Sequence, residues 1–125
     1  MIKGVDHVDL VVSDMDQAIT FYSEKLSLKI THDGRPDGGR KHTFLGDDTG
    51  AFLALEEDRR FRVEGSGKQR LGHLAFAVDH VEAARTELTR RGVAITGERA
   101  DDDGKAKSYY FSGPDGIHLE IYGPL

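Results

Sequence analysis

The chain of 125 residues contains no cysteine, which excludes disulfide bonds, thiolate metal sites and a cysteine nucleophile. This absence fits a cytoplasmic protein, because disulfides are rare in that compartment. An excess of positive charge is also missing. The formal net charge of −5 argues against nucleic acid or an anionic membrane surface as the main partner. Residues 1–9 lack a long apolar run, so neither a signal peptide nor a membrane-spanning segment is expected.

An internal repeat organises what is present. The segment His7–Val12 resembles His73–Val78, and 73 − 7 gives an offset of 66 residues. The offset also superimposes apolar residues at helical spacing, namely Met15, Ala18 and Tyr22 on Val81, Ala84 and Leu88. It places Gly50 on Gly116, each just before a strand-like run. One offset that fits three elements without a gap indicates a duplication.

Each half is predicted to fold as a strand, a helix and three further strands, which gives an α+β domain over residues 1–125. Module 1 spans about residues 1–57, a linker covers 58–70, and module 2 spans about 71–125. Strands are expected at 5–12, 28–32, 41–45, 51–56, 72–79, 93–96, 108–112 and 117–122. Helices are expected from a cap at Ser13 or Asp14 to about Ser27, and over 81–91. Residues 33–39 and 58–70 look like flexible connections, and Gly113–Gly116 like a tight turn.

The strand alternation indicates a metal site. His7 shares a face with Asp9, and the equivalent His73 heads a face of small residues, so the two histidines are expected to face each other across a cavity. Glu120 ends the last strand on one face with His118. Two imidazoles and one carboxylate are a normal ligand set for Mn, Fe, Zn, Ni or Co. The sequence therefore predicts one divalent ion bound by His7, His73 and Glu120, with positions left open for a substrate.

The repeat also shows a missing ligand, because the partner of Glu120 is position 54 (120 − 66), which is alanine. Glu56 lies two residues further on the same face and either approaches the metal, acts as a base or faces solvent. Asp9 is either a buried polar group bonded to the metal shell or a general base. Tyr110 either fills core space or contacts substrate.

The remaining histidines are assigned from their positions on the expected elements. His118 shares its strand face with the glutamate and is a candidate to support the metal ligands. His32, His42 and His80 are expected at the surface, with His80 at the start of a helix.

These residues resemble the vicinal oxygen chelate superfamily, which includes glyoxalase I, fosfomycin-resistance proteins, extradiol dioxygenases and bleomycin-resistance proteins. The run from Ser108 to Glu120 carries the most specific part of the resemblance. The resemblance implies paired βαβββ modules that form a curled mixed sheet around a metal cavity. His7, His73 and Glu120 fall on the ligand positions of that family. It further implies a homodimer whose sites are shared, with His7 from one subunit and the other two ligands from its partner.

No subfamily pattern matches completely. Glyoxalase I has a fourth ligand at the position of Ala54, whereas fosfomycin-modifying transferases use three ligands and match Ser108 and Tyr110 in their substrate loop. Those transferases usually carry threonine at the position of Asp9. Extradiol dioxygenases share a tyrosine, proline, glycine and glutamate run, but their upstream histidine has no counterpart in residues 101–107. Bleomycin-binding members lack the metal ligands that this sequence retains.

The leading hypothesis is a metal-dependent lyase, transferase or dioxygenase acting on a small substrate that chelates the metal through adjacent oxygens. Glu56, Asp9 or Tyr110 is expected to move a proton, and Ser108, Tyr110 and His118 to contact substrate. Transfer of a thiol to an epoxide is one version of this chemistry. The alternative is a non-catalytic protein that binds and sequesters a small drug or metabolite, as bleomycin-resistance proteins do.

Overall fold

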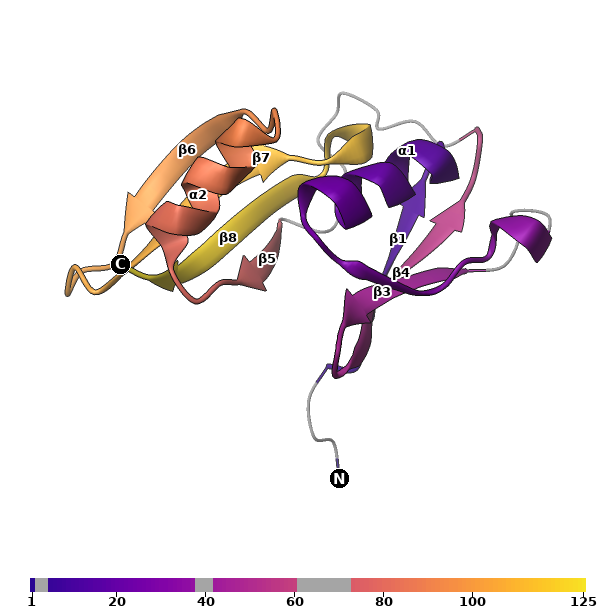
Figure 1. Cartoon of the computed structure of the whole chain (residues 1–125), viewed down its shortest axis with the longest axis horizontal. Helices are drawn as coiled ribbons and strands as arrows, with labels where there is room; N and C mark the ends of the chain where they lie inside the picture. The colour runs from indigo at the N-terminus through magenta and orange to yellow at the C-terminus, as the bar shows by residue number, and fades with distance from the viewer. Residues whose placement is uncertain (2–4, 38–41, 61–72) are drawn as a thin grey trace. The chain divides into compact units, whose positions relative to one another are not determined.

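A computed structural model describes residues 1, 5–37, 42–60 and 73–125 of the chain. The chain divides into two compact units, Met1–Arg62 and Val63–Leu125. Each unit contains a four-stranded mixed sheet and one α-helix, and Figure 1 colours the first from indigo to magenta and the second from orange to yellow. The predicted α+β class and the βαβββ order of each module are confirmed.

The elements of the first unit are β1 (Val8–Val12), α1 (Met15–Thr20), β2 (Lys29–His32), β3 (Thr43–Asp47) and β4 (Gly50–Glu57). Those of the second unit are β5 (Leu74–Ala77), α2 (Val81–Arg90), β6 (Ile95–Ala100), β7 (Ala106–Ser112) and β8 (His118–Pro124). Within the described residues, three short helical turns accompany them, namely η1 (Phe21–Lys25), η2 (Arg35–Asp37) and η3 (Pro114–Gly116). Every predicted strand is present, with boundaries shifted by a few residues.

The strand order is β1-β4-β3-β2 in the first sheet and β5-β8-β7-β6 in the second. In both sheets the first strand runs parallel to the last, and the other pairs are antiparallel. Asp9 lies opposite Ala54 in the first sheet, and Ala75 lies opposite Glu120 in the second. Since 75 − 9 and 120 − 54 both equal 66, the sequence offset is preserved in the strand pairing.

One face of each sheet supplies core residues, as the alternation predicts. On β1, Leu10 and Val12 are buried, whereas Asp9 and Val11 are exposed. On β8, Leu119 and Ile121 are buried, whereas the side chains of His118 and Tyr122 are exposed. The α2 helix contacts β7 and β8, and α1 contacts β4. The apolar face of each sheet therefore packs with the helix of its own unit.

The first helix is shorter than predicted. Asp14 caps it by accepting a hydrogen bond from the backbone N–H of Gln17 at 3.0 Å, as expected for one of the two candidate caps. The α-helix ends at Thr20 and continues as a π-helical turn to Lys25. Ser27, the predicted end of the helix, has a positive φ of 60°. This left-handed conformation follows the end of the helical segment.

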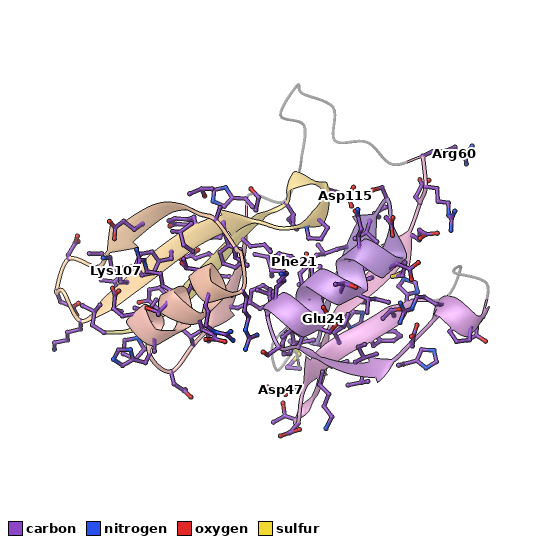
Figure 2. All side chains as sticks on the ribbon, turned by 45° about the horizontal axis from the view of Figure 1, so that its top comes forward. Phe21, Glu24, Asp47, Arg60, Lys107 and Asp115 are labelled. Carbon is purple, nitrogen blue, oxygen red and sulfur yellow. The ribbon has the colours of Figure 1, made fainter. Side chains whose placement is uncertain are left out.

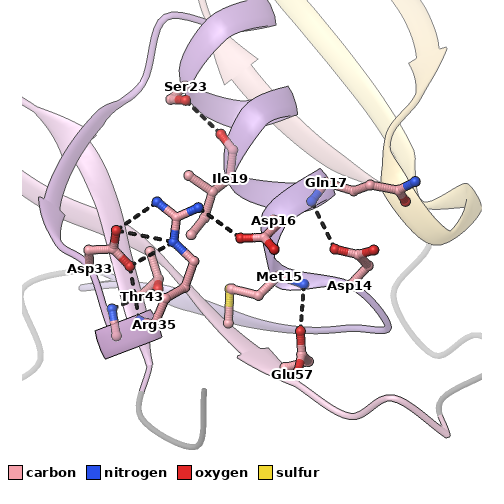
Figure 3. Close-up of polar contacts among 11 residues, drawn as sticks. Asp14, Met15, Asp16, Gln17, Ile19, Ser23, Asp33, Arg35, Thr43 and Glu57 are labelled. Atoms are coloured by element: carbon pink, nitrogen blue, oxygen red, sulfur yellow. Dashed lines mark hydrogen bonds and ion pairs between the residues drawn. The ribbon is translucent and has the colours of Figure 1, made fainter. Parts of the chain in front are cut away.

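The stretch from Asp33 to Asp37 is held by specific contacts, so the prediction of a flexible connection was wrong for this part of residues 33–39. The Arg35 guanidinium donates to Asp33 at 2.7 Å and to Asp16 at 2.9 Å (Figure 3). The hydrogen bonds from Arg35 lower the pKa of Asp33 to about 2. The backbone N–H of Gly34 also donates to the buried Thr43 hydroxyl at 3.0 Å. Residues 38–39 and most of the predicted linker lie outside the described residues.

The predicted tight turn before the last strand is confirmed as η3. Asp115, labelled in Figure 2, and Gly116 have positive φ angles of 62° and 72°. The 3₁₀ turn begins with Pro114, whose ring suits the start of a helical turn. None of the helices in the described residues has both the length and the apolar character needed to cross a membrane.

The packing makes a stability prediction for Leu119 and its repeat partner Leu53 (53 + 66 = 119), which are 0% and 1% exposed. Replacing either with alanine is expected to lower the free energy of unfolding by about 2–5 kcal/mol, because each change leaves a cavity in a packed core. Val11→Ala is the control, since Val11 is 38% exposed and its loss should cost less than about 1 kcal/mol. Urea unfolding followed by circular dichroism measures all three, and equal losses would contradict the assigned core.

Candidate functional site

Glu120 is the centre of the polar site in the second unit. It lies on the interior strand β8, opposite Ala75 on β5 and Tyr110 on β7, and is only 7% exposed. The Ser108 hydroxyl donates a hydrogen bond to Oε1 of this carboxylate. Nε2 of His73, the residue just before β5, lies 3.0 Å from Oε2. Both carboxylate oxygens therefore have a partner, as a buried charge requires.

The pairing of His73 with Glu120 fits two ligands of one metal ion. Zinc and similar ions bind imidazole nitrogen and carboxylate oxygen at about 2.0–2.2 Å, so two ligand atoms on one ion lie about 3 Å apart. The observed separation of 3.0 Å between Nε2 and Oε2 is close to this value, and it is also the length of a direct hydrogen bond between an imidazole and a carboxylate. The Ser108 hydroxyl holds the other carboxylate oxygen through its hydrogen bond.

Two aromatic side chains surround this pair on the same face. The rings of Tyr110 and His118 meet edge to face with centroids 5.2 Å apart. The His73 ring lies 6.4 Å from Tyr110 and 6.2 Å from His118, measured between centroids. Tyr110 is half-buried and His118 is exposed. The structure thus brings together five predicted site residues of the second unit, namely His73, Ser108, Tyr110, His118 and Glu120.

His7 belongs to the first unit, so its membership of the three-ligand set stays a prediction. Its Nδ1 lies 2.8 Å from the carboxylate of Asp6. Because Nδ1 is paired in this way, Nε2 is the nitrogen that would bind a metal. The His7 ring meets Phe44 edge to face at 6.4 Å between centroids. Phe44 is the repeat partner of Tyr110 (44 + 66 = 110), so the two histidines have equivalent aromatic neighbours.

A second polar cluster lies in the first unit. It contains Asp9 and Glu56, which were predicted to transfer a proton, and His42, which was not predicted as a site residue. Nε2 of His42 lies 2.8 Å from the Asp9 carboxylate and 3.2 Å from that of Glu56. Asp9 is on β1, Glu56 on β4, and His42 directly precedes β3. The Asp9 side chain is 38% exposed and therefore is not the buried group that one interpretation required. Glu56 faces His42 and not solvent alone.

The two carboxylates change the protonation of His42. The hydrogen bond to Asp9 is the main cause of a raised His42 pKa, and Glu56 adds to it. A raised pKa in the folded state means that protonated His42 stabilises the fold. This contribution is fully present below the ordinary histidine pKa of about 6.5 and is lost as the pH rises through the folded-state value.

The sequence predicts a surface position for His42. Its side chain is 40% exposed, so the location is confirmed, but its pairing with two acidic side chains was missed. The repeat contained a usable signal, because 42 + 66 gives Ser108, a residue already chosen for the site. The predictions for His32 and His80 are confirmed, since both are exposed and His80 caps α2 by accepting from the Ala83 backbone N–H.

Comparison with known proteins gives consistent matches. Residues 4–121 match the model of the Glyoxalase/Bleomycin resistance protein/Dioxygenase superfamily. The metallothiol transferase FosB of Staphylococcus epidermidis is 31% identical, over 98% of this chain and 84% of FosB. A glyoxalase family protein from Enterococcus faecalis is 31% identical in structure-based alignment, with a TM-score of 0.77 over 96% of this chain and 97% of that one. A glyoxalase/dioxygenase from Nostoc punctiforme has the same fold, with a TM-score of 0.81, 24% identity and coverage of 98% and 92%.

The His42 geometry predicts a measurable shift in protonation. In metal-free protein, the His42 pKa is expected to exceed the ordinary value of about 6.5 and to fall in Asp9→Asn. Glu56→Gln is the matched control and should lower it less, because its contact with Nε2 is longer. An NMR titration of the histidine ring protons measures the three values. An unchanged His42 pKa in Asp9→Asn would contradict the pairing.

Proposed function

This chain belongs to the Glyoxalase/Bleomycin resistance protein/Dioxygenase superfamily, and from that premise we propose that it is a metal-dependent enzyme. Its substrate is a small molecule that offers two adjacent oxygens to the metal. His7, His73 and Glu120 hold one divalent ion of the Mn, Fe, Co, Ni or Zn type. The observation that carries the proposal is the 3.0 Å approach of His73 Nε2 to the buried Glu120 carboxylate.

The bound ion would supply Lewis-acid stabilisation of negative charge on a substrate oxygen. The protein's own groups do the remaining work. Ser108 holds the Glu120 carboxylate in one orientation, and the ring of Tyr110 and that of His118 contact the substrate beside it. Glu56, Asp9 or Tyr110 moves a proton in this proposal. The two carboxylates are exposed enough to reach a ligand, and Tyr110 lies beside Glu120 on the neighbouring strand.

Two observations favour thiol transfer as the first reaction to test. Curated relatives include metallothiol transferases named FosB, which are 30% and 31% identical to this chain in two Staphylococcus species. In addition, this chain has alanine at position 54, where the resemblance to glyoxalase I would require a fourth metal ligand. The remaining set of three ligands is the number that fosfomycin-modifying transferases use. The proposed reaction joins the sulfur of a small thiol to a carbon of an epoxide. The carbon–oxygen bond at that carbon breaks, and the oxygen stays on the adjacent carbon as a hydroxyl group. The proton that the hydroxyl takes up balances the proton that the thiol loses.

We further propose that two chains share each site, with His7 from one subunit and His73 and Glu120 from its partner. A complementation experiment tests this arrangement. His7→Ala and His73→Ala are each expected to lack the site, whereas refolding them together should restore one intact site in every mixed dimer. No recovery of metal-dependent turnover after mixing, in the presence of demonstrated mixed dimers, would contradict shared sites.

The enzyme proposal predicts that His73→Ala loses turnover together with this metal ion. The loss follows because one of two protein nitrogens in the ligand set is removed. Metal is measured by elemental analysis of protein purified without added metal. Turnover is measured by mass spectrometry as addition of glutathione or cysteine to fosfomycin with Mn²⁺ or Zn²⁺. His32→Ala is the control, since His32 is an exposed histidine of the first sheet.

The outcomes separate enzyme from binding protein. Wild-type turnover that is abolished by a chelator and restored by one metal supports the enzyme. An unchanged number of metal ions bound per chain in His73→Ala would show that the ligand assignment is wrong. Tight drug binding unaffected by chelator, without turnover by any thiol tested, would favour the sequestration alternative.

A further inference from the structure

The cluster of Asp9, His42 and Glu56 has the geometry of a metal site within the first unit alone. One ligand-type atom from each residue lies within 4.8 Å of the other two. The three residues are 33 and 14 positions apart in sequence, and strand pairing of β1 with β4 and of β4 with β3 brings them together. Both carboxylates are directed at the same atom, Nε2 of His42. A single cation placed among these atoms would contact all three residues.

The chemistry of this set differs from that of a purely acidic cluster. One imidazole nitrogen with two carboxylate oxygens suits the first-row divalent ions, whereas Ca²⁺ and Mg²⁺ prefer oxygen ligands throughout. Two carboxylates with a neutral imidazole carry a charge of −2, which one divalent ion balances. The side chains are between 38% and 45% exposed, so an ion can enter from solvent.

The repeat shows that this cluster is separate from the duplicated ligand positions. Adding 66 to its members gives Ala75, Ser108 and Tyr122 in the second unit, none of which is a carboxylate or an imidazole. Conversely, the buried carboxylate Glu120 of the second unit corresponds to Ala54. The first unit therefore lacks the carboxylate at one position and has two at neighbouring positions, directed at a histidine for which the second unit has serine.

From this convergence we propose that Asp9, His42 and Glu56 bind a second divalent ion of the zinc and manganese class. The site does not require His73 or Glu120. An ion bound there would occupy the Asp9 and Glu56 carboxylates and would leave Tyr110 as the proton-transfer group of the proposed function. The competing explanation is a protonated His42 that forms ion pairs with two carboxylates and has no affinity for metal. The two explanations differ in the number of metal ions bound by each chain.

Titration of the metal-free full-length chain with Zn²⁺ tests the proposal, with isothermal calorimetry and equilibrium dialysis as readouts at pH 7.5. The wild type is expected to bind two ions per chain. His42→Ala should lose one of them and keep the other, and His73→Ala should show the converse. Asp9→Asn and Glu56→Gln are expected to weaken the first-unit site by about tenfold or more, and His32→Ala should bind like the wild type. Circular dichroism confirms that each variant is folded.

The titration distinguishes failure of the second metal site from failure of the proposed enzymatic function. One ion that is lost in His42→Ala and retained in His73→Ala supports the second site even if the first site does not exist. An unchanged number of bound ions in folded His42→Ala overturns the proposal. A single wild-type ion that is lost only in His73→Ala overturns it equally, and leaves His42 as a protonated ion-pair partner.

Discussion

The alternation of side chains across each sheet is the constraint on which the candidate sites depend. Successive side chains of a strand point to opposite faces of the sheet. When one face is apolar and covered by a helix, every second residue therefore lies on the opposite, uncovered face. On β1 this rule buries Leu10 and Val12 and leaves Asp9 and Val11 exposed. Polar side chains from neighbouring strands then lie next to each other on the opposite face. Chemical groups far apart in sequence become neighbours because the strands that carry them are hydrogen-bonded to each other.

The duplication supplies the same backbone twice and different chemistry on each copy. Tyr110 and Phe44 occupy equivalent positions, as do Ser108 and His42. In the second unit a serine hydroxyl and an imidazole satisfy a buried carboxylate. In the first unit an imidazole takes the serine position, and two half-exposed carboxylates approach it. Buried charge in one copy and accessible charge in the other suit different tasks, namely rigid ligand placement and exchange with solvent.

Sequence reasoning succeeded where local chemistry determines structure. The cap at Asp14, the turn at Gly113–Gly116 and the alternating strands all follow from short-range preferences. It failed where a tertiary contact replaced such a preference. Residues 33–39 have the composition of a flexible connection, yet Arg35 binds Asp33 and also Asp16 on α1, a helix that no local rule could have linked to it. The helical segment that continues α1 ends at Lys25, and the positive φ of Ser27 that follows it is not predicted by the residue type serine.

The sequence by itself determined the two-module α+β fold, because the 66-residue offset and the strand alternation can be read along the chain. From the same pattern it predicted His7, His73 and Glu120 as metal ligands. Only the tertiary structure decided that Ser108 and His73 satisfy the two oxygens of Glu120. It also decided that Asp9 and Glu56 converge on His42. The physical reason is register: which residues face each other across β1, β4 and β3 depends on how the strands are aligned, and shifting one strand by a single residue would turn its side chains to the other face.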